Sequence, residues 1–261
     1  MSEIITAIEN CVPEEVYTDR QEHINFFYQA ALNAISRRTM STVLLGQRRM
    51  GKTEIFTRVV NRLFFNQDHH KNTVIPIFFR FSEETITRND FALQYAENFL
   101  RWFAAFRMND ASLLKQPRNL NQFISYIENN LTITKGLEIA IDTTKAIIDK
   151  GAVMPAQVAI MLPKDAAFAE DITIAVFLDE FQNTRLPHFD FSIVGYFQEA
   201  VESPKCPHFV TGSAMSILSD DILGKGALYG RFKAKRIDFG YIFRVYLDGT
   251  IRSGEPMDST H

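Results

Sequence analysis

Gly46-Gln47-Arg48-Arg49-Met50-Gly51-Lys52-Thr53 is the stretch of sequence that decides the fold. It fits the pattern G-x-x-x-x-G-K-[ST], in which a strand runs into a glycine-rich loop and a helix leaves it. Residues 41–45 (STVLL) supply a short apolar strand before the loop, and residues 54–65 supply an amphipathic helix after it. The context that the pattern needs is therefore present, and it predicts a phosphate-binding loop in an α/β fold.

The residue types in this loop suit a nucleotide and its metal ion. The glycines let the backbone bend so that its N–H groups point inward at the phosphates, and the helix start adds the positive end of its dipole. Lys52 is expected to reach the β- and γ-phosphates and to assist catalysis, and the Thr53 hydroxyl to ligate Mg²⁺. Contacts to the nucleotide are expected from Gly46, Gln47, Arg48, Arg49, Met50, Gly51, Lys52, Thr53 and Glu54.

A second motif supplies two carboxylates. Residues 172–178 (ITIAVFL) predict a buried strand, and Asp179 and Glu180 follow at its C-terminal end. Ligands of open α/β sheets bind at that end of the strands. We expect Asp179 to hold the Mg²⁺ shell and Glu180 to be the general base that polarises an attacking water. A small-molecule kinase must exclude water and often lacks the second carboxylate, so the pair favours ATP hydrolysis.

Two further stretches are weaker candidates for the site. Thr211-Gly212-Ser213 ends a predicted strand, where the Ser213 hydroxyl would hydrogen-bond the γ-phosphate or the lytic water. The same stretch also fits a turn that ends a strand with small residues. Arg231 follows a glycine and would supply positive charge to the transition state, within the chain or across a subunit interface. A surface arginine fits that position equally well.

Composition is that of a globular protein with no general affinity for nucleic acid. The chain has 261 residues, of which 46% are hydrophobic and 23% charged, enough for one large α/β domain or one domain with an appendage. The formal net charge of -3 gives no electrostatic footprint for nucleic acid. A local basic patch is left as the candidate for such binding, formed by Arg48, Arg49, Arg58 and Arg62.

No feature of the sequence indicates secretion or a membrane. The N-terminus has no basic region followed by an apolar run, and no apolar stretch approaches the ~20 residues that cross a bilayer. Cys11 and Cys206 are far apart in the sequence and fit no metal-ligand spacing. We therefore expect free thiols in a reducing compartment, a cytoplasmic location and no membrane association.

Hydrophobic periodicity and breaker residues predict the remaining elements. Asp19 is expected to cap a helix with Glu22 as its capping-box partner. Pro163 is expected to lie in a loop. Strands are predicted at 74–81, 207–211 and 234–241, and helices at 89–108, 120–128, 137–149 and 189–201. The expected organisation is an arm at 1–18 with little regular structure, a P-loop domain at 19–247 and a flexible tail at 248–261.

Taken together, the motifs resemble those of the archaeal-type ATPases, which belong to the STAND/AAA+ branch of P-loop NTPases. The resemblance covers about residues 17–239, which is most of the chain. It is carried by Tyr17-x-Asp19-Arg20-x-Glu22, Gly46 to Thr53, Phe177-Leu178-Asp179-Glu180-Phe181, Thr211-Gly212-Ser213 and Leu228-Tyr229-Gly230-Arg231. The phosphate loop and the Asp-Glu strand are shared by P-loop ATPases generally, whereas the first and last of these motifs narrow the resemblance to this family.

The resemblance implies a three-layer fold with a mostly parallel sheet of order 5-1-4-3-2, and ATP with Mg²⁺ rather than GTP. It implies that the segment with Asp19 and Arg20 lies beside the adenine or ribose, which adds Arg20 to the nucleotide contacts. It also implies that Ser213 or Thr211 senses the γ-phosphate and that Arg231 is a γ-phosphate or interface arginine. Family members commonly continue into a helical lid and a winged-helix region. The sequence ends about twenty residues after the predicted fifth strand, so we expect no lid and slow turnover.

Three functions are consistent with these residues. The leading hypothesis is an ATPase domain that works as a nucleotide-driven switch, either as a homo-oligomer or with a protein partner. The first alternative is an ATP-binding interaction module or truncated remnant that does not hydrolyse ATP. The second is a DNA-associated ATPase, since replication initiators share the Asp-Arg-x-Glu opening by resemblance.

Replacement of the loop lysine tests the reading that all three functions share. Lys52→Ala removes the cation that would face the β- and γ-phosphates, so it is expected to abolish ATP binding. Isothermal titration calorimetry of the wild type and the variant measures this. An unchanged affinity would contradict the assignment of the loop.

Overall fold

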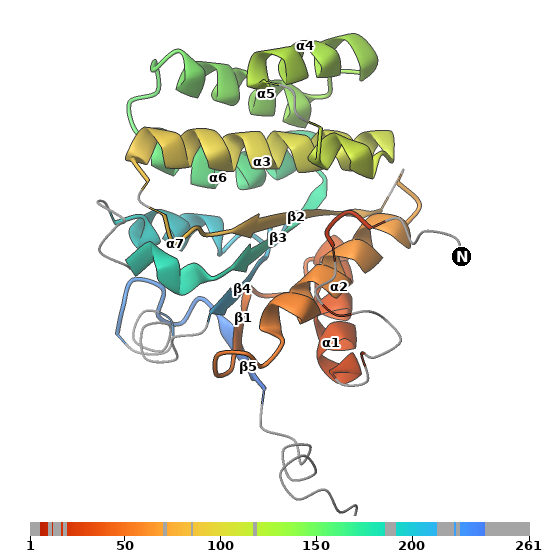
Figure 1. Cartoon of the computed structure of the whole chain (residues 1–261), viewed down its shortest axis with the longest axis vertical. Coiled ribbons are helices and arrows are strands. Elements are labelled where there is room, and N and C mark those ends of the chain that lie inside the picture. The colour runs from red at the N-terminus through yellow and green to blue at the C-terminus, as the bar shows by residue number, and fades with distance from the viewer. Residues whose placement is uncertain are drawn as a thin grey trace, which may run out of the picture.

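Five strands form one all-parallel sheet, ordered β2-β3-β4-β1-β5 (Figure 1). The computed structural model describes residues 6–9, 12, 17, 20–69, 72–84, 86–116, 119–185, 192–212, 222 and 225–237. The strands are β1 Thr42–Leu45, β2 Val74–Arg80, β3 Thr173–Asp179, β4 His208–Gly212 and β5 Lys233–Arg236. This confirms the predicted α/β fold and the strand order 5-1-4-3-2. The first four strands are almost wholly buried because helices cover both faces of the sheet.

Helices lie on both sides of the sheet (Figure 1). On one side α1 packs on α2, which contacts β2, β3 and β4. On the other side α3 contacts β2, and α6 contacts β3. The helices and 3-10 turns are α1 Gln21–Asn33, η2 Ala34–Ser36, α2 Lys52–Phe65, α3 Arg88–Met108, η3 Ala111–Leu114, α4 Leu120–Asn130, α5 Lys135–Ile148, α6 Pro155–Glu170, η4 Phe181–Arg185, η5 Val194–Tyr196 and α7 Phe197–Ala200.

An additional helical layer lies above the predicted three. In Figure 1, α4 and α5 cover the outer side of α3 and α6, away from the sheet. The contacts between α5 and both α3 and α6 hold this layer in place. It accounts for the buried, almost continuous apolar character of α3, including Phe99, Phe103 and Phe106, which is packed from both sides. The middle of the chain therefore folds as an extension of the same core.

Four phenylalanine rings join the helices of the first layer to the sheet. Phe56 of α2 meets Phe177 of β3 edge to face, with ring centroids 5.3 Å apart. Phe177 stacks on Phe209 of β4 at 4.8 Å, and Phe27 of α1 contacts both Phe56 and Phe209. Edge-to-face and offset rings of this kind add about 0.5–1.5 kcal/mol per pair beyond the area that they bury. The cluster fixes α2, and with it the loop that precedes α2, against the central strands.

The prediction that Pro163 lies in a loop is wrong. It lies inside α6, where it is buried. A proline within a helix has no N–H to donate to the carbonyl of Ala159, which costs about 3 kcal/mol or more. The helix persists because α6 is packed between α3 and α5, and its small apolar side chains, Ala159, Ala166 and Ala167, are fully buried there. Pro155 begins this helix, a position where the missing N–H carries no penalty.

The N-terminus of α1 differs from the predicted capping box in the residues that the structure describes. The helix begins at Gln21 with Arg20 as its N-cap residue, which has a left-handed backbone (φ 74°) and makes no side-chain cap. Glu22 instead pairs with Lys235 of β5, its Oε1 2.8 Å from Nζ. Asp19 lies outside the described residues. The tertiary ion pair therefore takes the carboxylate that the sequence pattern assigned to the backbone.

Other element bounds differ from the predictions mainly at their ends. In the region predicted as a helix at 189–201, the described residues form the short η5 and α7. The strand predicted at 234–241 begins one residue earlier, and its end at 238–241 lies outside the described residues. The divisions at residues 18 and 247 stay predictions.

Two general expectations concern the membrane and the thiols. In the part of the chain that the structure describes, no helix has the length and apolar character that crossing a bilayer needs. Cys206 is a free, fully buried thiol, and burial raises its pKa. Cys11 lies outside the described residues.

His208, at the start of β4, makes the stability depend on pH. It is fully buried, and desolvation lowers its pKa to about 4 from 6.5. Between about pH 6.5 and 4, His208 binds a proton in the unfolded chain but stays neutral in the folded chain. The free energy of unfolding therefore decreases as pH falls through this range. We expect His208→Asn to remove up to about 2 kcal/mol of the loss between pH 6.5 and 5.0. Urea unfolding at both pH values measures this, and equal losses in the two proteins would contradict it.

Candidate functional site

The loop between β1 and α2 lies at the C-terminal edge of the sheet, beside the point where the strand order reverses. In the strand order β2-β3-β4-β1-β5, the chain after β1 continues to β2 at one end of the sheet, whereas β5 lies on the other side of β1. Open α/β sheets bind ligands at such a position. Gly51 caps α2 with φ 74°, a left-handed conformation that favours glycine. A Cβ at Gly46 would lie 3.4 Å from both Met50 Sδ and Ile237 Cβ, so the loop also packs closely there.

Lys52 is folded back into its own loop. The side chain is buried, and Nζ donates to the carbonyls of Gly46 (2.9 Å) and Gln47 (2.6 Å). Desolvation lowers its pKa, while the nearby negative charges of Glu180 and Asp179 act in the opposite direction. The charges of both carboxylates therefore act on the ammonium group. Among the described residues, its hydrogen bonds go to two backbone carbonyls, which phosphate oxygens could replace.

The hydroxyl of Thr53 is joined to the carboxylate of Asp179. Thr53 Oγ1 donates to Oδ2 at 2.9 Å, with Oδ1 at 3.2 Å, and the two residues are 126 positions apart in sequence. Both groups offer hard oxygen ligands of the kind that Mg²⁺ prefers. The two residues predicted to hold the metal are therefore in contact, and their chemistry fits it. No cluster of three or more His, Cys, Asp or Glu side chains suited to a metal occurs among the described residues.

Burial also changes the acidity of Asp179. Its side chain is 2% exposed, and desolvation raises its pKa. Arg80 and the hydrogen bond from Thr53 oppose this shift, whereas Glu180 adds to it. In the folded chain, a nearby cation therefore stabilises the charged form of Asp179.

Glu180 turns away from the strand in a left-handed conformation, with φ 56°. Gln182 Nε2 donates a hydrogen bond to Glu180 Oε2, and Asn183 Nδ2 bonds the carbonyl of Phe81 at 2.9 Å. Phe181, which lies between Glu180 and Gln182 in the sequence, is buried against Phe81 and Phe197. The turn after β3 is therefore fixed, and it holds the second carboxylate beside the loop. Gln182 is a residue that the sequence motifs did not indicate.

The other loop residues divide into two groups. Arg48 and Arg49 are exposed and Arg49 has φ 66°, so their side chains are available to a ligand. Met50 is buried, and its Sδ accepts a hydrogen bond from the backbone N–H of Gln47 at 3.0 Å. That N–H belongs to the set predicted to face the phosphates. A bound phosphate would have to replace the sulfur as its acceptor.

Glu54 lies in α2 with its carboxylate engaged inside the protein. It is paired with Arg58, Nε to Oε1 2.8 Å, and the two side chains are 4% and 7% exposed. Arg58 also donates to the carbonyl of Val12 at 2.7 Å and lies 3.8 Å from the Tyr17 ring centroid. The pair ties the N-terminal arm to α2, so Glu54 is placed to offer a ligand its backbone N–H rather than its carboxylate.

The proposed basic patch does not form as one surface. Arg58 is buried in the pair with Glu54, and Arg62 bonds Asn25 Oδ1 at 2.9 Å and lies over the Tyr28 ring. Arg48 and Arg49 remain exposed on the loop. Sequence proximity suggested four clustered charges, but α2 buries Arg58, and Arg62, which is partly exposed, is engaged by residues of α1.

The N-terminal end of α1 lies at the same edge of the sheet as the loop. His23 Nε2 is 3.1 Å from the carbonyl oxygen of Arg236, the last residue of β5. The next residue, Ile237, contacts the position of Gly46. Arg20, which precedes this helix, is therefore at this edge of the sheet, and its contact with the adenine or ribose stays a prediction.

The two remaining candidates have different outcomes. Thr211, near the end of β4, is fully buried and its Oγ1 has no hydrogen-bond partner among the described residues, while Ser213 lies outside them. Arg231 precedes β5 and so lies at the opposite, N-terminal edge of the sheet, where it pairs with Glu202 at 2.8 Å. The six residue-to-residue steps from 231 to 237 span roughly 20 Å at about 3.3 Å per step. The structure does not bring Arg231 to the loop of its own chain.

Arg80 is the main site residue that the motifs missed. It ends β2 directly beside Asp179 in the strand register, and its Nε donates to Oδ2 at 2.9 Å. The only signal in the sequence is a charged residue at the end of an apolar strand. That signal becomes informative only when β2 and β3 are known to be neighbours.

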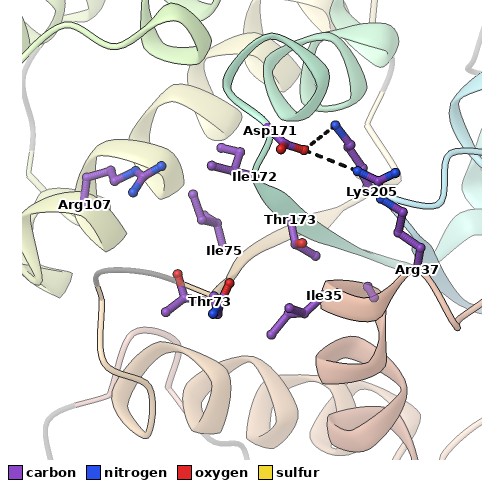
Figure 2. A pocket seen from close by; sticks show the side chains of 11 residues that line it. Ile35, Arg37, Thr73, Ile75, Arg107, Asp171, Ile172, Thr173 and Lys205 are labelled. Carbon is purple, nitrogen blue, oxygen red and sulfur yellow. Dashed lines mark hydrogen bonds and ion pairs between the residues drawn. The ribbon is translucent and has the colours of Figure 1, made fainter.

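A separate cavity of about 380 Å³ lies at the opposite edge of the sheet. Figure 2 shows Arg107 on one side of it, and Arg37 and Lys205 converging on Asp171 at the other. These cations are already paired: Asp171 is 2.6 Å from Lys205 and 3.4 Å from Arg37, and Arg107 is 2.5 Å from Glu170. The cavity is therefore distinct from the loop site, and its charges are satisfied within the protein.

Comparisons with known proteins do not identify the family of the chain. No protein-family model and no curated protein sequence matches the chain. Among solved structures, the chain is similar to the Walker-type ATPase PABY2304 of Pyrococcus abyssi, with 16% sequence identity and a TM-score of 0.44. The match covers 88% of this chain and 56% of that one, so the chain spans little more than half of its length. Likeness at this level does not identify the family, and the archaeal-type assignment stays a prediction.

The buried pair of Glu54 and Arg58 gives a test of which role Glu54 has. Arg58→Met leaves the carboxylate buried without its cation, so we expect a loss of about 3–5 kcal/mol in the free energy of unfolding. Glu54→Leu combined with Arg58→Met removes both charges and is expected to recover most of that loss. Urea unfolding measures both.

ATP affinity of the double variant is the second readout. It is expected to match the wild type, because Glu54 offers only its backbone. A clear loss of affinity in a stably folded double variant would assign the carboxylate to nucleotide binding instead.

Proposed function

We propose that the chain is a Mg²⁺-dependent ATPase domain whose nucleotide state acts as a switch. The observation that carries the proposal is the meeting of Lys52, Thr53, Asp179 and Glu180 at one edge of the sheet. Lys52 and Thr53 begin α2, whereas Asp179 ends β3 and Glu180 follows it. The strand before α2, β1, is separated from β3 by β4. A phosphate loop facing two carboxylates is the arrangement that hydrolysis of a nucleoside triphosphate requires.

Binding would begin with an exchange of hydrogen-bond partners in the loop. Lys52 would leave the carbonyls of Gly46 and Gln47 for the β- and γ-phosphates, and the N–H of Gln47 would leave Met50 Sδ. Each acceptor that is given up is neutral and each one that is gained is an anionic oxygen, so the new contacts are stronger. Burial of Lys52 strengthens its attraction for phosphate, since water does not screen it.

Hydrolysis would rest on positioning and on charge. Thr53 and Asp179 would hold Mg²⁺, which supplies neutralisation of the charge that develops on the phosphate oxygens. Glu180 would accept a proton from the attacking water, with Gln182 holding its carboxylate in place. The buried hydroxyl of Thr211 would report the γ-phosphate, a role that the sequence assigned to Thr211 or Ser213.

Turnover is expected to be slow. Arg231 pairs with Glu202 at the far edge of the sheet, so any contribution to the transition state would come from a neighbouring copy of the chain. P-loop enzymes without such an arginine turn over well below about 1 s⁻¹. A long-lived ATP state is what a switch needs, and adenine or ribose contacts near Arg20 would give the preference for ATP.

Replacement of the proposed base tests this function. Glu180→Gln removes the proton acceptor and keeps the shape of the side chain. We expect ATP turnover to fall by about 100-fold or more, with ATP affinity retained. Phosphate release under saturating Mg²⁺ and ATP measures the rate, and calorimetry measures the affinity.

Glu128→Gln is the matched control, because Glu128 is an exposed carboxylate of α4 that pairs with Lys145 of α5, in the outer helical layer. It is expected to leave turnover unchanged. A wild-type protein that binds ATP without any turnover would favour the non-hydrolysing module. A Glu180→Gln variant as active as the wild type would remove Glu180 from the mechanism.

A further inference from the structure

Arg80 occupies the electrostatic position that the metal would take. It is the last residue of β2, opposite Asp179 in the register of the sheet. Its guanidinium Nε lies 2.9 Å from Asp179 Oδ2, and the same oxygen accepts a hydrogen bond from Thr53 Oγ1 at 2.9 Å. Thr53 and Asp179, the two residues proposed to hold Mg²⁺, are thus hydrogen-bonded to each other, and Arg80 balances the negative charge of Asp179.

We propose that Arg80 is a resident cation of the Mg²⁺ site, which stabilises the metal-free state and must leave Asp179 when Mg²⁺ binds. This inference rests on the proposed function for the identity of the metal site. Arg80 belongs neither to the glycine-rich loop nor to the Asp179-Glu180 motif. Its presence makes the affinity for Mg²⁺ depend on a competition between Arg80 and the metal ion for Asp179.

The competition follows from the chemistry of the two partners. An arginine side chain stays protonated at all relevant pH values, so the contact cannot be released by loss of a proton. Asp179 is buried, and burial disfavours its charged form unless a cation is near. A second cation at the same carboxylate would be repelled by the first. Mg²⁺ and the Arg80 guanidinium therefore exclude each other.

Arg80 is free to move in a way that Asp179 is not. The arginine side chain is 51% exposed, whereas that of Asp179 is 2% exposed. The guanidinium carbon also lies 5.9 Å from the ring centroid of Phe78, two residues earlier on the same face of β2. Cations are attracted to an aromatic face at such distances. Displaced from Asp179, Arg80 can turn to water and keep this ring as a neighbour.

A purely structural counter-ion would look similar in the metal-free protein but would behave differently with metal. In that case, removing Arg80 would lower stability and leave the Mg²⁺ requirement unchanged. A competitor lowers the apparent affinity for Mg²⁺ by the fraction of time for which Asp179 is available. If the guanidinium occupies Asp179 about nine-tenths of the time, the apparent affinity falls about tenfold.

The test replaces the charge and keeps most of the stem. Arg80→Met is expected to lower the Mg²⁺ concentration that half-saturates binding of a fluorescent ATP analogue by about tenfold. It is also expected to lower the melting temperature in EDTA and to enlarge the stabilisation by Mg²⁺·ATP. Arg80→Lys keeps a cation near Asp179 and is expected to behave more like the wild type, which also serves if Arg80→Met folds poorly.

Arg37→Met is the matched control. Arg37 is 59% exposed and pairs with an aspartate, Asp171, but at the opposite edge of the sheet. It removes the same charge, so an effect of overall charge on Mg²⁺ binding would appear in both variants. Equal Mg²⁺ dependence in the wild type, Arg80→Met and Arg37→Met would overturn the inference.

Binding of Mn²⁺ alone separates this inference from the proposed function. The free ion is followed by electron paramagnetic resonance with no nucleotide present. Tighter Mn²⁺ binding by Arg80→Met than by the wild type supports the competition, even where ATP does not bind and the proposed function fails. Identical Mn²⁺ binding by the two proteins overturns the competition, even where ATP binding and hydrolysis are intact.

Discussion

The carboxylate of Asp179 is the group on which the arrangement of the site depends. It is buried at the end of β3 and is reached by Thr53 from the start of α2 and by Arg80 from the end of β2. A buried charge must be compensated, so the ends of these three elements are held together. The edge of the sheet where we propose that nucleotide binds is therefore held together by the protein's own contacts. Because Asp179 has lost its hydration, a divalent cation near its carboxylate would stabilise the charged form.

The position of that carboxylate is set by packing behind it. Phe56, Phe177 and Phe209 lock α2 to β3 and β4, and Phe27 adds α1 to the same cluster. On the other side of the sheet, Phe181 is held by aromatic neighbours and fixes the turn that carries Glu180. The high phenylalanine content thus has a structural role on both faces. The site depends on two apolar clusters that contain none of its polar groups.

Arginines show most clearly where sequence reasoning stops. Arg58 and Arg62 follow the loop at helical spacing, yet one is buried with Glu54 and the other lies over an aromatic ring. Arg231 has a motif that suggests the active site, but the parallel direction of β5 places it at the far edge. Arg80 has no motif and lies at the centre. Spacing along the chain does not encode which residues of distant strands become neighbours.

The sequence by itself indicated the glycine-rich loop between a strand and a helix, the carboxylate pair and the α/β fold class, because each depends on local patterns. The strand order was implied by the family resemblance of the motifs. The sequence did not determine the helical layer of α4 and α5, the buried Pro163 or the partner of Glu22. Those depend on tertiary contacts that override local preference. Pro163 is tolerated inside the buried helix α6, and Glu22 pairs with Lys235 of β5. Only the tertiary structure brought Arg80 to Asp179 and removed Arg231 from it, because that choice is made by the order and direction of strands that are far apart in the chain.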